Sequence, residues 1–180
     1  YRAAGYEVHF LGNSSWQSIY ELLDHSVADQ TIWMHKTAFK KNLHYRYQLL
    51  KLVYGYSYET VINPIFSRDK RNDDAFVRAA GARYRIGMKA NPEAVKPYER
   101  GYDHNLFTTL FDYPEKPLFE FYRNRLFTEY ITGQPASVEN TRVQPQLLPA
   151  LPAGLPKQYF VVFPGSRSSA RIWDVAHFIT

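Results

Sequence analysis

Short apolar runs alternate with stretches of helical periodicity over the first half of the chain. Runs rich in branched and aromatic residues predict four strands, at residues 7–12, 31–34, 60–65 and 84–88. Strands that alternate with helices are typical of a parallel sheet with crossover connections. The pattern therefore predicts an α/β fold.

Three helices are expected between these strands. The first follows a cap at Ser14 or Ser15, and its apolar positions recur at helical spacing: Trp16, Ile19, Leu22 and Leu23. The second runs from Phe39 to near Gly55, and one apolar stripe is expected along it: Leu43, Tyr47, Leu50 and Tyr54. The third covers residues 73–80 and ends at Gly81, with Asp73 and Asp74 as charges at its N-terminus.

The second half of the chain changes character. Residues 91–117, rich in Pro, Gly, Asp and Asn, predict a surface connection, and a helix is expected at 118–131, closed by Gly133. Five prolines in 134–156 indicate an extended linker. An apolar strand is expected at 159–163 and a helix from Asp174. Because the chain stops inside that helix, we expect a fragment with a first domain at 1–133 and the start of a second at 157–180.

Composition narrows the class of protein. The chain has 45% hydrophobic and 17% aromatic residues, which argues against disorder. It has no cysteine, so disulfides and thiolate zinc sites are excluded, and its six histidines show no metal-site spacing. Neither a signal peptide nor a long apolar run is present, so we expect a soluble, cytoplasmic protein. The net charge of +5 is spread over several elements, which disfavours a nucleic-acid partner.

The sequence VVFPGSRSSARIWD is the richest in candidate chemistry. A strand that runs into Gly165 and Ser166 shortly before a helix offers backbone N–H groups and a helix dipole to an anion. Arg171 would add a fixed positive charge with bidentate geometry. The segment predicts a diphosphate site, while a solvated turn of an ordinary α/β protein is the alternative.

This segment resembles the opening of the second domain in glycosyltransferase family 9, the ADP-heptose:lipopolysaccharide heptosyltransferases. Pro164, Gly165, Ser166, Arg171 and Trp173 keep the spacing of that family, whereas Asp174 stands where the family usually has Pro. Residues 61–88 and 119–133 resemble the family's later first-domain segments more weakly. The resemblance implies a GT-B fold of two Rossmann-like domains, here an incomplete N-terminal domain plus the start of the C-terminal domain.

The resemblance also implies a function. A heptose or related sugar would pass from an ADP-sugar donor to a saccharide acceptor of bacterial lipopolysaccharide or surface glycan, with inversion and without a metal or further cofactor. The donor diphosphate would contact Gly165, Ser166 and Arg171. The general base, an Asp, would lie before Tyr1, so we expect no catalytic residue in the fragment and no activity from it. The alternative is a non-catalytic α/β module that binds a nucleotide or phosphorylated ligand.

Acceptor-side residues are sought at the carboxyl ends of the strands, where parallel sheets bind ligands. The positions there are Gly12, Asn13, Asn63, Ser67, Arg68 and Gly87. Of these, Asn63, Ser67 and Arg68 are the candidates for the acceptor, and Arg68, Lys70 and Arg71 could hold its phosphate or carboxylate groups.

The second predicted helix is basic, with Lys36, Lys40, Lys41, His44, Arg46 and Lys51 around its apolar stripe. Such a segment can rest on an anionic bilayer, here the cytoplasmic face of the inner membrane, or bind a phosphorylated glycolipid. A charged outer face on an ordinary packed helix is the other interpretation.

Overall fold

The computed structural model describes residues 1–68, 71–90, 103–112, 118–137, 146 and 150–159 of the 180-residue chain. The chain divides into two compact units, Tyr1–Arg142 and Val143–Thr180, and the division falls inside the segment predicted to be a linker. All helices and strands considered below belong to the first unit. The assignment of the two units to two domains of one family stays a prediction.

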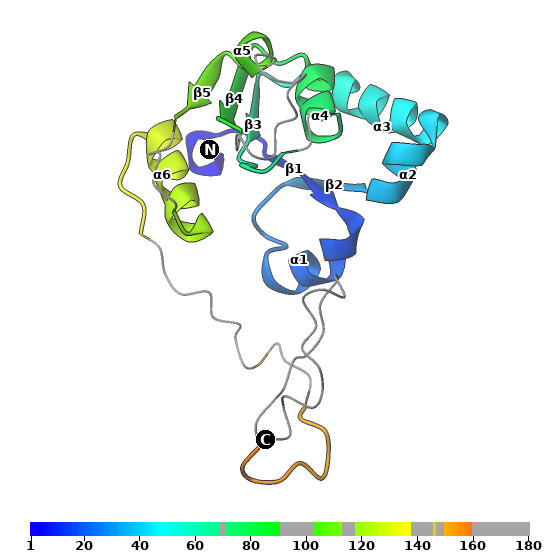
Figure 1. Cartoon of the computed structure of the whole chain (residues 1–180), viewed down its shortest axis with the longest axis vertical. Helices are drawn as coiled ribbons and strands as arrows, with labels where there is room; N and C mark the ends of the chain where they lie inside the picture. The colour runs from blue at the N-terminus through cyan, green and yellow to red at the C-terminus, as the bar shows by residue number, and fades with distance from the viewer. Residues whose placement is uncertain (69–70, 91–102, 113–117, 138–145, 147–149, 160–180) are drawn as a thin grey trace, which may run out of the picture. The chain divides into compact units, whose positions relative to one another are not determined.

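The first unit contains two small parallel sheets (Figure 1). Strand β1 (His9–Asn13) pairs with β2 (Gln30–Met34), with Leu11 opposite Ile32. In the second sheet β4 (Tyr84–Met88) lies between β3 (Thr60–Asn63) and β5 (Thr109–Phe111). Every pairing is parallel, so each connection must cross from one end of its sheet to the other. The fold is mixed α/β and consistent with a Rossmann-like arrangement.

Helices fill most of these connections. Two 3₁₀ turns occur early, η1 (Arg2–Ala4) and η2 (Ser14–Trp16). The α-helices are α1 (Gln17–Leu23), α2 (Lys36–Lys41), α3 (Leu43–Gly55), α4 (Asp73–Ala80), α5 (Asp103–Leu106) and α6 (Glu120–Thr132).

The main hydrophobic core draws on β2 and on helices α2, α3 and α4. Its buried members are Ile32, Met34, Phe39, Leu49, Val53, Phe76, Ala80 and Ala82. The rings of Phe39 and Phe76 stack with centroids 4.7 Å apart, which joins α2 to α4. A smaller cluster of Val77, Leu106 and Phe107 packs on the second sheet.

Several local predictions are confirmed. Strand β4 and helix α4 have the predicted bounds, and Gly81 ends α4 with φ of 58°. Gly133 likewise ends α6 with φ of 65°, in the left-handed region that glycine adopts at least cost. Strand β3 ends at Asn63, two residues earlier than predicted, where Pro64 follows and cannot donate to a ladder.

The single helix predicted from Phe39 to Gly55 is wrong. Asn42 has extended backbone angles (φ −109°, ψ 105°) and separates α2 from α3. Its side-chain oxygen accepts a hydrogen bond from the Tyr45 N–H at 3.0 Å and so caps α3. A local cap therefore starts a second helix within a segment for which periodicity alone predicts a single helix.

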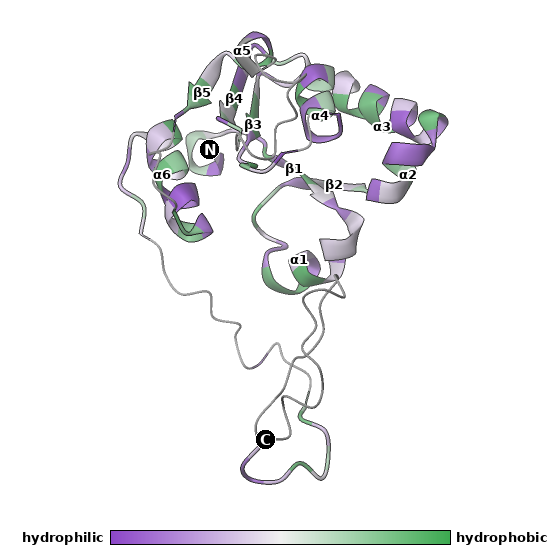
Figure 2. Ribbon diagram, in the orientation of Figure 1, coloured by the Kyte–Doolittle hydropathy of each residue, from purple (hydrophilic) through white to green (hydrophobic). Residues whose placement is uncertain are grey.

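The apolar stripe predicted on this segment does not form the buried face. Leu43, Tyr47 and Tyr54 are 80%, 60% and 70% exposed, and of the predicted stripe only Leu50 packs against the core, whereas Leu49 and Val53 are buried. Figure 2 shows hydrophobic and hydrophilic residues mixed along α3, so periodicity did not single out one face. The packing against α4 decided which side became the core.

Two further predictions are corrected. The cap of the first helical segment is Asn13, whose side-chain oxygen accepts from the Ser15 N–H at 3.2 Å, and not Ser14 or Ser15. Residues 91–117 are not only a connection, because α5 and β5 lie within them. The strand after Tyr159 and the helix from Asp174 lie outside the described residues.

Within the described part of the chain, no helix has the length and apolar character needed to cross a bilayer.

Candidate functional site

A buried polar cluster lies at the carboxyl edge of β3 and β4. It consists of Asn63, the last residue of β3, Arg68 in the following loop, Asp74 in the first turn of α4, and the carbonyl of Met88 at the end of β4. Three of these side chains are buried, with Asn63 6%, Arg68 3% and Asp74 0% exposed. We call this set the β3-edge cluster.

Asp74 is the centre of the β3-edge cluster. Its carboxylate lies 3.0 Å from Arg68 Nε through Oδ1, and its Oδ1 also accepts from Asn63 Nδ2 at 3.4 Å. Arg68 Nη1 donates to the Met88 carbonyl, and Asn63 Oδ1 accepts from the Ile65 N–H at 3.1 Å. A buried charge pair is tolerated best when its remaining hydrogen-bonding atoms also find partners, and these contacts supply partners for Arg68 Nη1 and for the Asn63 side chain.

An aromatic ring closes one side of the cluster. The Arg68 guanidinium lies 4.7 Å from the centre of the Phe107 ring, which is itself buried. Phe107 can lie across β4 because Gly87 has no side chain, since a Cβ at that position would meet the ring at 2.6 Å. Gly87 is therefore a packing residue at this edge.

The loop that carries Ser67 is held from a second direction by α6. The Arg123 guanidinium lies 3.7 Å from the centre of the Phe66 ring. Arg123 Nη1 contacts Glu120 Oε2 at 2.6 Å and Nη2 donates to the Leu118 carbonyl at 2.9 Å. Ser67, between Phe66 and Arg68, has an exposed side chain. The two arginines thus fix a short loop that presents a hydroxyl to solvent.

The structure brings together two of the three predicted acceptor-side residues. Asn63 and Arg68 share the carboxylate of Asp74, and both are buried, so of the three only Ser67 reaches the surface. Arg71 is exposed, and Lys70 lies outside the described residues. Their roles toward an acceptor stay predictions.

Sequence reasoning missed the role of Asp74. It lies in the first turn of α4 as predicted, but it faces the end of β3 and is fully buried. An acidic residue at a helix start that follows an arginine in the same strand-to-helix loop is the signal that could have indicated an ion pair.

The carboxyl end of β1 is used for packing and capping. A Cβ at Gly12 would lie 2.7 Å from both the Phe10 and Trp33 rings, so any other residue would force a ring to move. Asn13 caps the 3₁₀ turn through its side chain. Gly12 and Asn13, which were predicted to lie at the ligand-binding edge of the sheet, therefore have structural roles.

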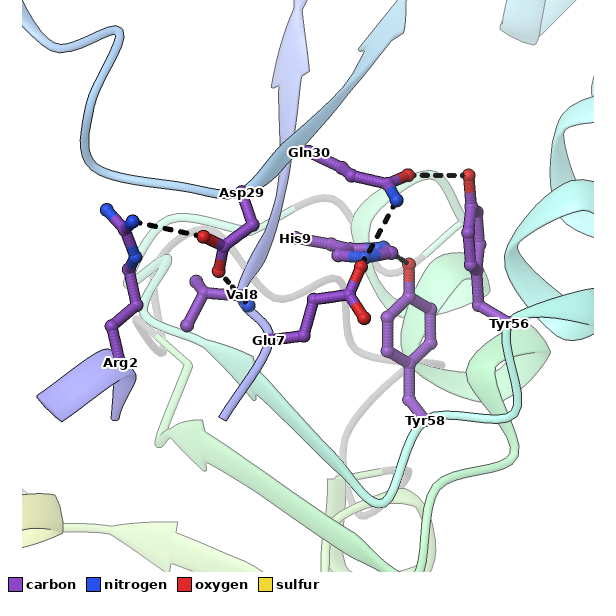
Figure 3. Close-up of polar contacts among 8 residues, drawn as sticks. All are labelled: Arg2, Glu7, Val8, His9, Asp29, Gln30, Tyr56 and Tyr58. Atoms are coloured by element: carbon purple, nitrogen blue, oxygen red, sulfur yellow. Dashed lines mark hydrogen bonds and ion pairs between the residues drawn. The ribbon is translucent and has the colours of Figure 1, made fainter. Parts of the chain in front are cut away.

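A second polar cluster lies at the opposite, amino end of β1 and β2, and periodicity gave no sign of it (Figure 3). His9 has a side chain only 7% exposed, with Nε2 2.8 Å from Glu7 Oε1 and Nδ1 2.8 Å from the Tyr58 hydroxyl. Gln30 donates to Glu7 Oε1 at 3.1 Å and accepts from the Tyr56 hydroxyl at 3.0 Å. The contacts join the first sheet to the segment that leads into β3.

The hydrogen-bond partners of His9 indicate which of its ring nitrogens carries the proton. An ionised Glu7 carboxylate only accepts, so Nε2 of a neutral His9 carries the proton and Nδ1 accepts from the Tyr58 O–H. Burial, with the nearby Tyr56 and Glu7, raises the pKa of Tyr58 to about 12. Tyr58 therefore stays a donor at neutral pH, and the cluster orients the chain.

Two hollows among the described residues of this unit lie away from the β3-edge cluster. One of about 490 Å³ is lined by Arg2, Gly5, Tyr6, Glu7, Asp29 and Gln30. Arg2 and Asp29 of this lining form an ion pair at 3.1 Å. This hollow lies at the amino ends of the strands, whereas ligands of parallel sheets bind at the carboxyl ends. Among the described residues, no group of three or more His, Asp or Glu side chains is arranged to hold a metal ion.

The predicted diphosphate residues Gly165, Ser166 and Arg171, with Trp173, lie outside the described residues. Their role depends on the sequence alone. Comparison of the chain with models of protein families, with curated proteins and with solved structures finds no match.

Proposed function

We propose that the protein is a GT-B glycosyltransferase that transfers a heptose or a related sugar from an ADP-linked donor to a saccharide of a bacterial surface glycan. The observation that carries the proposal is the segment 161–174, in which an apolar run leads into Gly165 and Ser166, followed by Arg171. The parallel α/β fold of the first unit supports it, because such sheets present loops to ligands at their carboxyl edge.

The proposed chemistry assigns each residue a physical task. The acceptor hydroxyl gives its proton to the aspartate base that the resemblance implies, and its oxygen attacks the anomeric carbon as the bond from that carbon to the donor diphosphate breaks, so the configuration inverts. Negative charge develops on the departing diphosphate. Arg171, the Ser166 hydroxyl and the N–H groups of Gly165 and Ser166 would stabilise it, because fixed donors are most effective where charge appears in the transition state. Ser67 is the exposed candidate on the acceptor side.

Calorimetric titration of the protein, in the form its gene encodes, tests the donor site. We expect ADP-heptose to bind more tightly than ADP or UDP-sugars. Arg171→Ala should weaken that binding about 10- to 150-fold, the cost of losing a charge-assisted hydrogen bond of roughly 1.5 to 3 kcal/mol. Arg167→Ala removes the same charge four residues earlier in the sequence and serves as the control, with a change below about threefold expected for a charge that does not contact the diphosphate.

Each result has a separate meaning. Binding of ADP and ADP-sugar with equal affinity, without release of ADP when saccharide acceptors are added, would favour the non-catalytic module that binds a phosphorylated ligand. A failure to bind any nucleotide sugar, or equal losses for Arg167→Ala and Arg171→Ala, would overturn the assignment of the diphosphate site.

A further inference from the structure

The outward side of α3 carries an apolar stripe that no described residue covers. Leu43, Tyr47 and Tyr54 are the most exposed large apolar residues of this helix. On an ideal helix these three positions fall within about 40° of one another, and Leu49 and Val53 project to a different side. The stripe therefore lies on the flank of α3, apart from Leu49 and Val53, while Leu50 at its edge packs partly against the core.

The charge around the stripe has one sign. Residues 35–58 contain five Lys and Arg residues and no Asp or Glu. Lys41 and Lys51 are exposed, Lys41 two residues before Leu43 and Lys51 one helical turn after Tyr47. Arg46, in contrast, is used within the fold, where it donates to the Arg71 carbonyl at 2.6 Å and lies over the Phe39 ring.

Helix α1 provides an internal comparison. Ile19 and Leu22 are also exposed, at 54% and 44%, but Glu21 and Asp24 lie beside them. Apolar exposure thus occurs on both helices, and of the two only α3 lies in a sequence segment that has basic residues and no acidic ones. An ordinary solvated face would carry polar residues in place of Leu43 and Tyr47.

We propose that Leu43, Tyr47, Lys51 and Tyr54 of α3, together with Lys41 at the end of the preceding helix α2, bind the surface of an anionic lipid bilayer, and we call this set the α3 face. Leucine and tyrosine partition into the boundary between headgroups and acyl chains, and tyrosine keeps its hydroxyl in the polar layer. Lysine ammonium groups are attracted to the phosphates of an anionic leaflet. The proposal does not depend on the transfer reaction proposed above.

Flotation of the full chain with lipid vesicles tests the α3 face. We expect binding to phosphatidylcholine vesicles that contain about a third phosphatidylglycerol, and much weaker binding to phosphatidylcholine alone. Lys41→Gln with Lys51→Gln should lower the association constant about 30-fold, near fivefold for each lysine. Leu43→Ser with Tyr47→Ser should lower it at least tenfold, through lost apolar burial.

Matched control variants distinguish binding through the α3 face from the effect of total charge and of exposed apolar residues elsewhere. Arg83→Gln with Lys157→Gln removes the same charge elsewhere, and Ile19→Ser with Leu22→Ser removes exposed apolar residues from α1. Both pairs should change binding less than about threefold. All substituted side chains are exposed, so the thermal unfolding midpoint should stay unchanged and report intact folding.

Two results would overturn the proposal. One is equal binding to neutral and anionic vesicles, or equal losses in the control variants. The other is an absence of vesicle binding together with a dimer in sedimentation that Leu43→Ser with Tyr47→Ser dissolves, because a second copy would then be the occupant of the α3 face. Transfer to a water-soluble acceptor is measured separately, so failure of the bilayer proposal leaves the transferase proposal intact.

Discussion

Arg68 Nε lies 3.0 Å from Asp74 Oδ1 at the carboxyl edge of β3, and neither side chain is exposed to solvent. The pair ties the loop after β3 to the first turn of α4, and the Arg68 contact with the Met88 carbonyl ties the same loop to β4. Both charged groups of a buried pair lose their hydration when the chain folds. Removal of one partner is therefore costly, because the other charge stays buried without compensation.

Asp74→Ala should reduce the free energy of unfolding by about 3 to 5 kcal/mol, because it leaves the Arg68 guanidinium buried without its carboxylate. Urea unfolding measures the change. Asp112→Ala is the control, since the Lys89–Asp112 pair has the same 3.0 Å distance but is exposed, and it should cost less than about 1 kcal/mol. A cost for Asp74→Ala as small as that of the control would contradict the burial of the pair.

Stability should fall as the pH rises from about 10 to about 12. The pKa of Tyr58 is about 12 in the folded chain against 10 for an ordinary tyrosine, so the unfolded chain loses this proton first and is favoured in that window. Below pH 10 both states hold the proton, and the contribution is fully present. Urea unfolding across this pH range should show a shallower decline for Tyr58→Phe, while Tyr54→Phe, at an exposed position, should behave like the unmodified chain.

Tyr58→Phe should also cost about 1 kcal/mol at neutral pH, because His9 Nδ1 loses the hydroxyl that donates to it. The comparison of the two tyrosine variants at pH 7 measures this cost. An unchanged free energy of unfolding for Tyr58→Phe would show that the His9–Tyr58 hydrogen bond contributes nothing to stability.

Gly87→Ala should destabilise the chain by about 1 to 3 kcal/mol, since the new Cβ would lie 2.6 Å from the Phe107 ring. Gly55→Ala is the control, because a Cβ there meets nothing within 4 Å, and it should be neutral or slightly stabilising. Thermal unfolding compares the two. Phe107→Leu in the Gly87→Ala background should recover part of the lost stability, because the smaller side chain makes room for the new Cβ. An equal change in the unfolding midpoint for Gly87→Ala and Gly55→Ala would contradict the close packing of Phe107 on Gly87.

Asn42→Ala should cost about 1 kcal/mol, because the N-terminal N–H of Tyr45 loses its side-chain acceptor. Asn124→Ala, at an exposed position within α6, is the matched control and should change stability by less than about 0.5 kcal/mol. Circular dichroism during urea unfolding reports both. Equal costs for the two substitutions would mean that α3 does not need this cap.

Local signals explain what could be predicted. Helix α4 and the ends of α4 and α6 follow from apolar periodicity and from Gly81 and Gly133, whose positive φ ends a helix without reference to the rest of the fold. Strand β5 was missed because it has only three residues and forms by pairing with β4, far away in the sequence. Its existence depends on a partner that no local pattern contains.

The sequence by itself determined the alternation of strands and helices, and hence a mixed α/β fold with parallel sheets. It is also the source of the diphosphate hypothesis at Gly165, Ser166 and Arg171. Tertiary structure decided that Leu49 and Val53, and not Tyr47 and Tyr54, face the core. It also decided that Arg68 pairs with Asp74 inside the fold. The physical reason is that burial of a side chain, apolar or charged, depends on which distant residues pack against it.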